Sequence, residues 1–310
     1  MNTATQKRSP EYQSSFVHTP DVSLFVVEAG NPNNPAILFL HGYPDTHEVW
    51  SYQMAALADS YHVITFDIRG MGQSSVPSPI AGSYRFPQLI GDIHAVIDAT
   101  CGKEGKVHLV GHDWGSVIGW SFVLNPQHNP RLLSWTSMSG PDLRLMQHNV
   151  LTAWKTYKPK HILSSLSQFI RSFYVYTMFI PKLWELAFGR YGKPKKFSRM
   201  LTRSGIPQND PSLPKTKEAL WHRLKHGLNL YRQNVFRWLP LPEKGACNVP
   251  TQLIMLTRDD YIRPVCFLDL DQFVNQLTRV ELAEKHWAQK SNPTAVTQII
   301  QTFIKEQEGH

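Results

Sequence analysis

Short apolar runs alternate with amphipathic segments over the first 141 and the last 70 residues of the chain. Runs without charged residues in their centres are typical of buried strands in a parallel sheet. They lie at residues 14–18, 22–30, 36–40, 62–67, 106–111, 132–138 and 249–256, and a last strand pattern, with Glu281 in its centre, lies at 279–283. Helical patterns lie between them at 48–59, 83–100, 114–124, 265–277 and 293–306. This alternation predicts an α/β fold in which helices cover both faces of a mostly parallel sheet.

The alternation stops between about residues 142 and 240. This stretch is rich in Trp, Tyr, Phe and Lys, and it contains several helical patterns and a proline-broken loop at 205–214. We therefore predict a helical lid at 142–240, inserted between a first core part at 1–141 and a second core part at 241–310.

A chain of 310 residues can bury the core of one large domain with such an insert. Its net charge of +8 is uneven, because residues 151–245 hold 18 Lys and Arg against 4 Asp and Glu. The insert thus carries +14 and the remainder −6. Steering of anionic substrates and contact with an anionic membrane surface are two functional interpretations, but a solvated, solubilising face is the preferred one. No nucleic-acid-binding motif accompanies the charge, so we expect no nucleic-acid partner.

Targeting and cysteine patterns favour a cytoplasmic protein. The first ten residues lack the apolar centre of a signal peptide, and charges at Arg171, Lys182 and Glu185 interrupt the most apolar later stretch. We therefore expect no stable membrane insertion. The three cysteines match no metal or redox spacing, which indicates reduced intracellular thiols. They are Cys101, Cys247 and Cys266.

Residues 106–116 carry the candidate chemistry. An apolar run ends at Gly111, a helical pattern starts after Gly115, and Asp113 lies midway, as at the tip of a nucleophile elbow. A carboxylate there needs no base to activate it and can open a strained carbon–oxygen or a carbon–halogen bond, which leaves an ester on Asp113. The simpler alternative is that Asp113 only caps the helix that follows.

Such a nucleophile requires donors for the negative charge that forms when its ester is cleaved. In this type of turn one backbone N–H comes from the residue after the nucleophile and the other from the loop after an earlier strand. Here these positions are Trp114 and Tyr43, and we predict that their N–H groups form the oxyanion hole.

A water-activating pair is expected late in the chain. Asp259 and Asp260 follow the strand at 249–256, and His286 follows the last predicted strand. The order nucleophile, acid, histidine is the one that this strand arrangement requires. We predict that His286 takes a proton from water while Asp259 orients the imidazole, with Asp260 as the alternative acid.

Taken together, these motifs resemble the α/β-hydrolase superfamily and, within it, the epoxide hydrolases. The resemblance covers nearly the whole chain through His41-Gly42-Tyr43-Pro44, residues 67–74, Gly111-His112-Asp113-Trp114-Gly115, Asp259 and His286-Trp287. It implies that Asp113 opens an epoxide and that water then releases a vicinal diol. It also implies that two lid tyrosines donate hydrogen bonds to the epoxide oxygen.

The lid offers three tyrosines for that role. Tyr174 and Tyr231 lie in segments similar to those that carry the family tyrosines, and Tyr176 is the replacement for Tyr174. Tyr176 and Trp114 are also expected to contact the substrate. The alternative is that these rings only pack the lid.

Other functions remain open at this stage. A haloalkane or haloacid dehalogenase uses the same three catalytic residues, and a catalytically silent protein could bind a small molecule in the lid pocket. The many lid aromatics favour a small hydrophobic epoxide as substrate. We expect neither a metal nor a cofactor, since neither a metal-binding motif nor a phosphate-binding glycine loop occurs. The sequence leaves a homodimer open.

Overall fold

The computed structural model describes residues 10–180, 182–184, 186–187, 193–210, 212–237 and 239–309. Glu185 and the first nine residues, on which part of the targeting prediction rests, lie outside these ranges. Among the described helices, none combines the length and the apolar character needed to cross a membrane.

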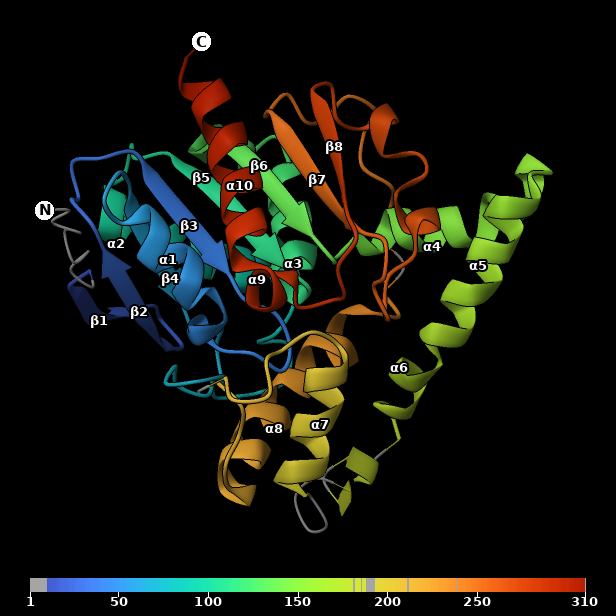
Figure 1. The fold of residues 1–310 in the computed structure, drawn as a ribbon, viewed down its shortest axis with the longest axis horizontal. Coiled ribbons are helices and arrows are strands. Elements are labelled where there is room, and N and C mark those ends of the chain that lie inside the picture. Colours follow the sequence, from blue (N-terminus) through green and yellow to red (C-terminus); the bar gives the residue numbers. More distant parts are fainter. Residues whose placement is uncertain are drawn as a thin grey trace, which may run out of the picture.

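One sheet of eight strands forms the centre of the molecule, in the order β1-β2-β4-β3-β5-β6-β7-β8 (Figure 1). All neighbours from β4 to β8 pair in parallel, whereas β2 is antiparallel to β1 and β4. The strand bounds are Tyr12–His18, Ser23–Ala29, Ala36–Leu40, His62–Phe66, Val107–His112, Leu132–Met138, Thr251–Leu256 and Leu277–Leu282. The predicted α/β class with a mostly parallel sheet is confirmed.

Helices cover both faces of this sheet, as the buried central strands require. On one face α1 (Ser51–Leu57) packs against α10 (Pro293–Glu308) and α9 (Ala288–Ser291), and on the other α2 (Phe86–Cys101) packs against α3 (Trp114–Val123). The five residues of β3 and of β4 are all buried. Fully buried tryptophans fill the layers between sheet and helices, namely Trp50, Trp120 and Trp135.

The parallel register brings the carboxyl ends of the central strands together. Leu40 at the end of β3 pairs with Gly111 of β5, and His112 pairs with Met138 at the end of β6. The turns that follow these strands therefore meet at one edge of the sheet, where open α/β sheets bind their ligands.

In the part of the chain that the structure describes, five α-helices follow β6 and cover this edge before the chain returns to the sheet at β7 (Figure 1). They are α4 (Leu143–Thr152), α5 (Pro159–Arg171), α6 (Phe173–Thr177), α7 (Pro194–Arg203) and α8 (Lys217–Asn234). Short 3-10 turns precede two helices, at His47–Trp50 and Ala153–Thr156, and a third, Asn129–Arg131, precedes β6. This helical segment lies within residues 142–240, and we refer to it as the lid.

One predicted element is wrong. Residues 265–277 do not form a helix but two 3-10 turns, Pro264–Phe267 and Leu270–Gln272. Cys247 N–H donates to the carbonyl of Phe273, and Asn275 N–H donates to the carbonyl of Cys247. Because this bridge pulls the chain into an extended path toward β8, a continuous helix cannot form there.

Candidate active site

Asp113 lies at the tip of a sharp turn between β5 and α3. Its backbone has φ 51° and ψ −121°, a conformation that costs energy for any residue with a Cβ. The turn is possible because glycines lie two positions before and two positions after Asp113. A Cβ on the second of them, Gly115, would lie 2.2 Å from the Leu40 carbonyl oxygen. Asp113 occupies the N-cap position of α3, but within the described range 10–180 its carboxylate forms no capping hydrogen bond. Helix capping therefore does not explain this residue.

The loop after β3 supplies a donor to the carboxylate. Tyr43 N–H donates to Asp113 Oδ1 at 2.7 Å. A Cβ on Gly42 would lie 2.4 Å from the same oxygen, so only glycine allows this close approach. Trp114 begins α3, and the N–H groups in the first turn of a helix have no intrahelical acceptor. Both predicted donors thus lie beside the nucleophile candidate.

His286 lies between the two carboxylates that the sequence singled out. Its Nε2 is 3.6 Å from Asp113 Oδ2, and its Nδ1 is 3.1 Å from Asp259 Oδ2. Burial lowers the pKa of His286, but the negative charges of Asp259 and Asp113 outweigh burial and raise that pKa well above its usual range. The imidazole is therefore charged while both carboxylates are charged.

The turn after β7 distinguishes the two acid candidates. Asp259 is buried, and its Oδ1 also accepts the N–H groups of Tyr261 at 2.7 Å and Ile262 at 3.2 Å. Burial raises the pKa of Asp259, but the charge of His286 and these hydrogen bonds lower it to below its ordinary value. Asp260 is exposed, and its carbonyl accepts from Arg171. Only the Asp259 carboxylate is thus in a position to orient His286.

Two of the three lid tyrosines lie near Asp113. The Tyr231 ring is buried and packs edge-on against Trp114, with 4.8 Å between ring centroids, and against Tyr43 at 5.5 Å. Burial and the charge of Asp113 raise the pKa of Tyr174 and of Tyr231, so both phenols stay protonated. Tyr176 is exposed and lines the outer part of the cavity, where its ring contacts Phe236.

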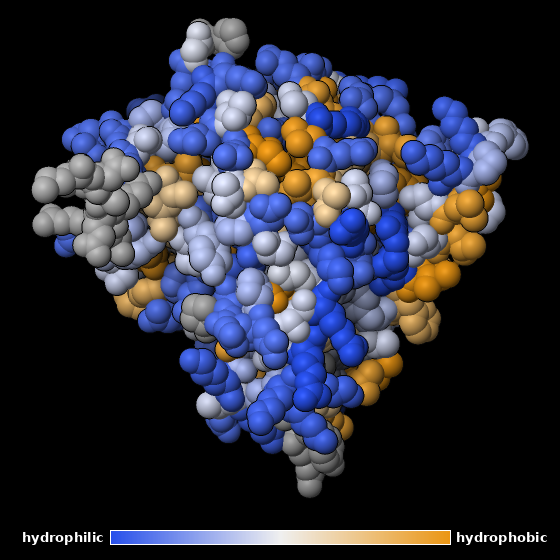
Figure 2. Space-filling view, in the orientation of Figure 1, coloured by the Kyte–Doolittle hydropathy of each residue, from blue (hydrophilic) through white to orange (hydrophobic). Residues whose placement is uncertain are grey.

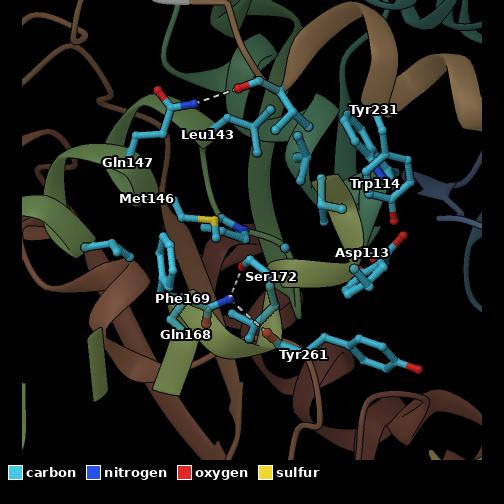
Figure 3. Close-up of a pocket in the computed structure, with 18 of the residues that line it drawn as sticks. Asp113, Trp114, Leu143, Met146, Gln147, Gln168, Phe169, Ser172, Tyr231 and Tyr261 are labelled. Carbon is cyan, nitrogen blue, oxygen red and sulfur yellow. Dashed lines mark hydrogen bonds between the residues drawn. The ribbon is translucent and has the colours of Figure 1, made fainter. Parts of the chain in front are cut away.

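A cavity of about 380 Å³ connects these groups to the surface. Figure 3 shows Asp113, Trp114 and Tyr231 at one end and Phe169, Gln168 and Ser172 at the other. Most lining side chains are apolar, among them Val117, Leu143, Met146, Val150, Val175, Val235, Phe236 and Ile262. A largely apolar pocket with a few polar groups at one end is typical of a small-molecule site.

Sequence reasoning missed Tyr261 and Gln168. The Tyr261 ring lies 4.7 Å from the His286 ring and forms part of the cavity wall. Gln168 Nε2 donates to the Tyr261 carbonyl at 2.9 Å, and this bond joins α5 to the acid turn (Figure 3). Tyr261 could have been noticed because it lies two residues after Asp259. Nothing in the local sequence indicated the long-range contact of Gln168.

A hydrogen bond and an ion pair also connect the lid to the chain segment just after His286. Trp287 N–H donates to the carbonyl of Ser204, just after α7. Lys290 and Asp210 are both buried, and their Nζ and Oδ2 atoms are 3.3 Å apart. A lid movement at this point would therefore disturb the histidine turn.

Known proteins resemble this chain over nearly its whole length. The chain is 28% identical over 305 residues to the "Probable oxidoreductase EphD" of Mycobacterium tuberculosis, covering 96% of this chain and 50% of EphD. It is 28% identical over 307 residues to "Epoxide hydrolase 3" of Xenopus tropicalis, covering 95% of this chain and 78% of that protein. This chain thus spans about half the length of the EphD proteins that it matches.

A solved structure and a family model locate the similarity. An inhibitor complex of the Bacillus megaterium epoxide hydrolase superposes with a TM-score of 0.75 at 22% identity, covering 94% of this chain and all of that one. The resemblance to epoxide hydrolases found in the sequence is confirmed by these relatives. The model of the alpha/beta hydrolase fold matches residues 35–293. This chain therefore belongs to the α/β-hydrolase fold family.

Proposed function

We propose that this protein is an epoxide hydrolase that acts through a covalent ester on Asp113. One observation carries the proposal: the elbow presents a carboxylate, rather than a hydroxyl, to an apolar cavity that also holds two protonated phenols. A carboxylate nucleophile can open an epoxide, and phenolic donors can protonate the ring oxygen, which stays attached to the substrate after the ring opens.

In the first step, Asp113 Oδ2 attacks one epoxide carbon and the bond from that carbon to the ring oxygen breaks. Oδ1 stays on the Tyr43 N–H and becomes the ester carbonyl oxygen. Tyr174 and Tyr231 donate hydrogen bonds to the epoxide oxygen, and one of them gives its proton to the alkoxide as that forms. That phenolate later regains a proton from solvent.

Ester formation also prepares the second step. The charge of Asp113 is one of the two that raise the pKa of His286, and an ester carries no charge. The pKa of His286 therefore falls when the ester forms, and His286 releases a proton to solvent and becomes the neutral imidazole that can act as a base. The remaining bond to Asp259 keeps Nε2 directed at Asp113.

Neutral His286 then takes a proton from a water molecule, whose oxygen attacks Cγ of Asp113. The negative charge that forms on Oδ1 is stabilised by the N–H of Tyr43 and, as we propose, by that of Trp114. The bond from Cγ to the substrate oxygen breaks, and that oxygen takes the proton from His286. A vicinal diol leaves. The second proton of the attacking water, which remains on the Asp113 carboxyl, then passes to His286, and this restores the Asp113 carboxylate and the charged imidazole.

The cavity lining supports a small hydrophobic epoxide with an aryl or alkyl substituent, with Tyr176 and Trp114 among its contacts. The three cysteines are free thiols, which supports a reducing, cytoplasmic location. A homodimer remains one proposed assembly, and the chemistry does not depend on it.

The test is the intact mass of the His286→Gln variant after incubation with a panel of epoxides and haloalkanes. This variant can form the ester but cannot activate water, so we expect a mass gain equal to the whole epoxide, which peptide mapping assigns to Asp113. The matched control is the double variant Asp113→Ala/His286→Gln, which should gain no mass.

Two results would contradict the proposal. An alkyl adduct with halide release, and none from epoxides, would make the protein a dehalogenase. The lack of any adduct, combined with reversible ligand binding, would favour the silent binding protein.

A further inference from the structure

Helix α5 has its polar and apolar faces reversed. A surface helix normally turns its apolar stripe toward the protein core. In α5 the residues buried against the rest of the chain are Ser165 and Gln168, at 2% and 1% exposed. Its apolar residues point outward instead.

The buried polar face is fully used in structural contacts. Ser165 Oγ donates to the Val150 carbonyl at 2.7 Å, and Gln168 Oε1 accepts the Arg263 N–H at 2.7 Å. Together with the bond from Gln168 to the Tyr261 carbonyl, these contacts fix the rotation of the helix. The outward direction of its apolar stripe is therefore determined by the fold.

The outer stripe follows helical spacing. Leu163, Leu166 and Ile170 of α5 are separated by three and four residues, and Phe173, the first residue of α6, follows three residues later; the four side chains are 46–66% exposed. Residues at this spacing share one face of a helix. Figure 1 shows α5 at the outer edge of the lid, far from the sheet, and Figure 2 shows hydrophobic side chains along that edge.

The segment before α5 continues the exposed apolar surface. Leu151 and Trp154 are more than half exposed, and Tyr157 is 87% exposed at the end of its 3-10 turn. Lysines alternate with these aromatics. They are the exposed Lys155, Lys158 and Lys160.

We name this surface the docking face and define it by its apolar members, Leu151, Trp154, Tyr157, Leu163, Leu166, Ile170 and Phe173. The surrounding sequence is strongly basic: residues 143–184 include six Lys and Arg and lack Asp and Glu altogether. Exposed apolar surface, tryptophan and tyrosine at its border, and basic residues around it are together typical of helices that lie in a membrane interface.

The active-site cavity opens onto the same side of the lid. Among the residues that line it, the four exposed ones are apolar or aromatic, namely Leu151, Phe169, Tyr176 and Phe236. Leu151 belongs to the docking face, and Phe169 lies next to Ile170 on α5. A molecule that covered the docking face would therefore also cover the mouth of the cavity.

We propose that the docking face binds the surface of an anionic lipid bilayer, without spanning it. The apolar side chains enter the boundary between headgroups and acyl chains, and the lysines bind the anionic headgroups. A second copy of this chain fits less well, since pairing through this face would bring two basic surfaces together. In this orientation the cavity mouth faces the bilayer, where hydrophobic small molecules concentrate. That last consequence alone rests on the proposed function.

The experiment is flotation of the whole protein with vesicles of pure phosphatidylcholine and with vesicles of equal parts phosphatidylglycerol and phosphatidylcholine. We expect binding to the anionic vesicles and little to the neutral ones. The variant Lys155→Gln/Lys158→Gln/Lys160→Gln should bind about a hundredfold more weakly, because each basic residue near an anionic surface is worth about fivefold.

Two matched controls distinguish the effect of the docking face on vesicle binding from the effects of net charge and of protein stability. Lys193→Gln/Lys195→Gln/Lys196→Gln removes the same charge at the start of α7 and should bind within about threefold of the unmodified protein, because those lysines lie away from the face. Leu166→Gln/Ile170→Gln should lose binding by at least about tenfold, whereas Phe16→Gln on the exposed edge strand β1 should not.

No binding to either type of vesicle would overturn the proposal. So would an equal loss of binding in both lysine variants. Sedimentation that showed a dimer, which Leu166→Gln/Ile170→Gln converted to a monomer, would assign the face to a second copy instead. All of these measurements are made without substrate, so their results do not depend on whether the proposed reaction is correct.

Discussion

The two halves of the site are held in place in different ways. Asp113, Asp259 and His286 lie on turns at the ends of parallel strands, where the sheet register and backbone hydrogen bonds determine their positions. Tyr174 and Tyr231 lie on lid helices, and their positions depend on ring packing and on single side-chain bonds between lid and core.

This difference assigns separate tasks to the two halves. The turns at the sheet edge hold the proposed nucleophile, acid and base. The lid provides the phenolic donors and an apolar wall. Changes in the core should therefore stop turnover, and changes in the lid should slow one step or loosen the structure.

The largest effect is expected from Asp259→Asn. Losing the charge that orients and stabilises the His286 imidazolium should lower kcat by about 10⁴-fold, as in other acid–histidine pairs. Rapid-quench measurements should still detect ester formation, because Asp113 is intact. The matched change Asp260→Asn should leave kcat near that of the unmodified protein, and a reversed result would exchange the roles of the two acids.

A smaller effect is expected in the lid from the double variant Tyr174→Phe/Tyr231→Phe. Without a donor to the alkoxide, epoxide opening should slow by about 10²–10⁴-fold, the usual range for general acid catalysis. The rate of ester hydrolysis, measured by single-turnover chase, should stay unchanged because the core groups remain. Tyr176→Phe is the control, and a large loss in that variant would transfer the donor role to Tyr176.

The ion pair between Lys290 of the core and Asp210 of the lid can be removed by mutation. Lys290→Met leaves the buried Asp210 carboxylate without its partner and should lower the free energy of unfolding by about 3 kcal/mol. Urea denaturation measures this loss, and Lys305→Met at an exposed position of α10 serves as control. Adding Asp210→Asn to Lys290→Met should restore part of the stability. If it does not, the pair contributes through packing and not through charge.

The smallest effect is expected on stability, from a pair of side chains in the sheet. Burial lowers the pKa of His62, but contacts with Cys101 and Glu28 outweigh it and raise that pKa to about 9. A raised pKa stabilises the folded state below the unfolded value of about 6.5, and this stabilisation disappears as the pH rises through about 9. Glu28→Gln should therefore lower the free energy of unfolding by about 1.5 kcal/mol at acidic pH and by much less above pH ~9.

Thermal unfolding at several pH values measures this difference, with the exposed Glu104→Gln as control. A destabilisation that does not change with pH would show that Glu28 acts without the charge of His62. Lid proteolysis should be the same in both variants, since His62 and Glu28 join β4 and β2 on the far side of the sheet from the lid.

Most of the core could be predicted from the sequence because its signals are local. The apolar run at 132–138 has the same bounds in the structure, and the glycines around Asp113 indicated the turn that is found. The order of Asp113, Asp259 and His286 was meaningful because parallel strands bring their carboxyl ends together. The proximity of these three side chains therefore followed from strand order without any knowledge of distances.

The features that could not be predicted from the sequence depend on contacts between residues that are distant in the chain. The helix predicted at 265–277 was wrong because the pairing of Cys247 with the chain near Val274 outweighs local helical preference. The reversal of α5 could not be seen either, since an amphipathic pattern does not state which face turns inward. Gln168 decides that direction through bonds to Tyr261 and Arg263, more than 90 positions away in the chain.

The backbone at Asp113 also constrains how this protein can evolve. With φ at 51°, the position suits glycine, and a substitution to glycine would relieve about 1–3 kcal/mol of strain. Mutation to glycine would therefore give a more stable protein that lacks the proposed nucleophile. Only selection for turnover can keep an aspartate at this site, so a descendant that no longer needs the reaction is expected to lose this residue early.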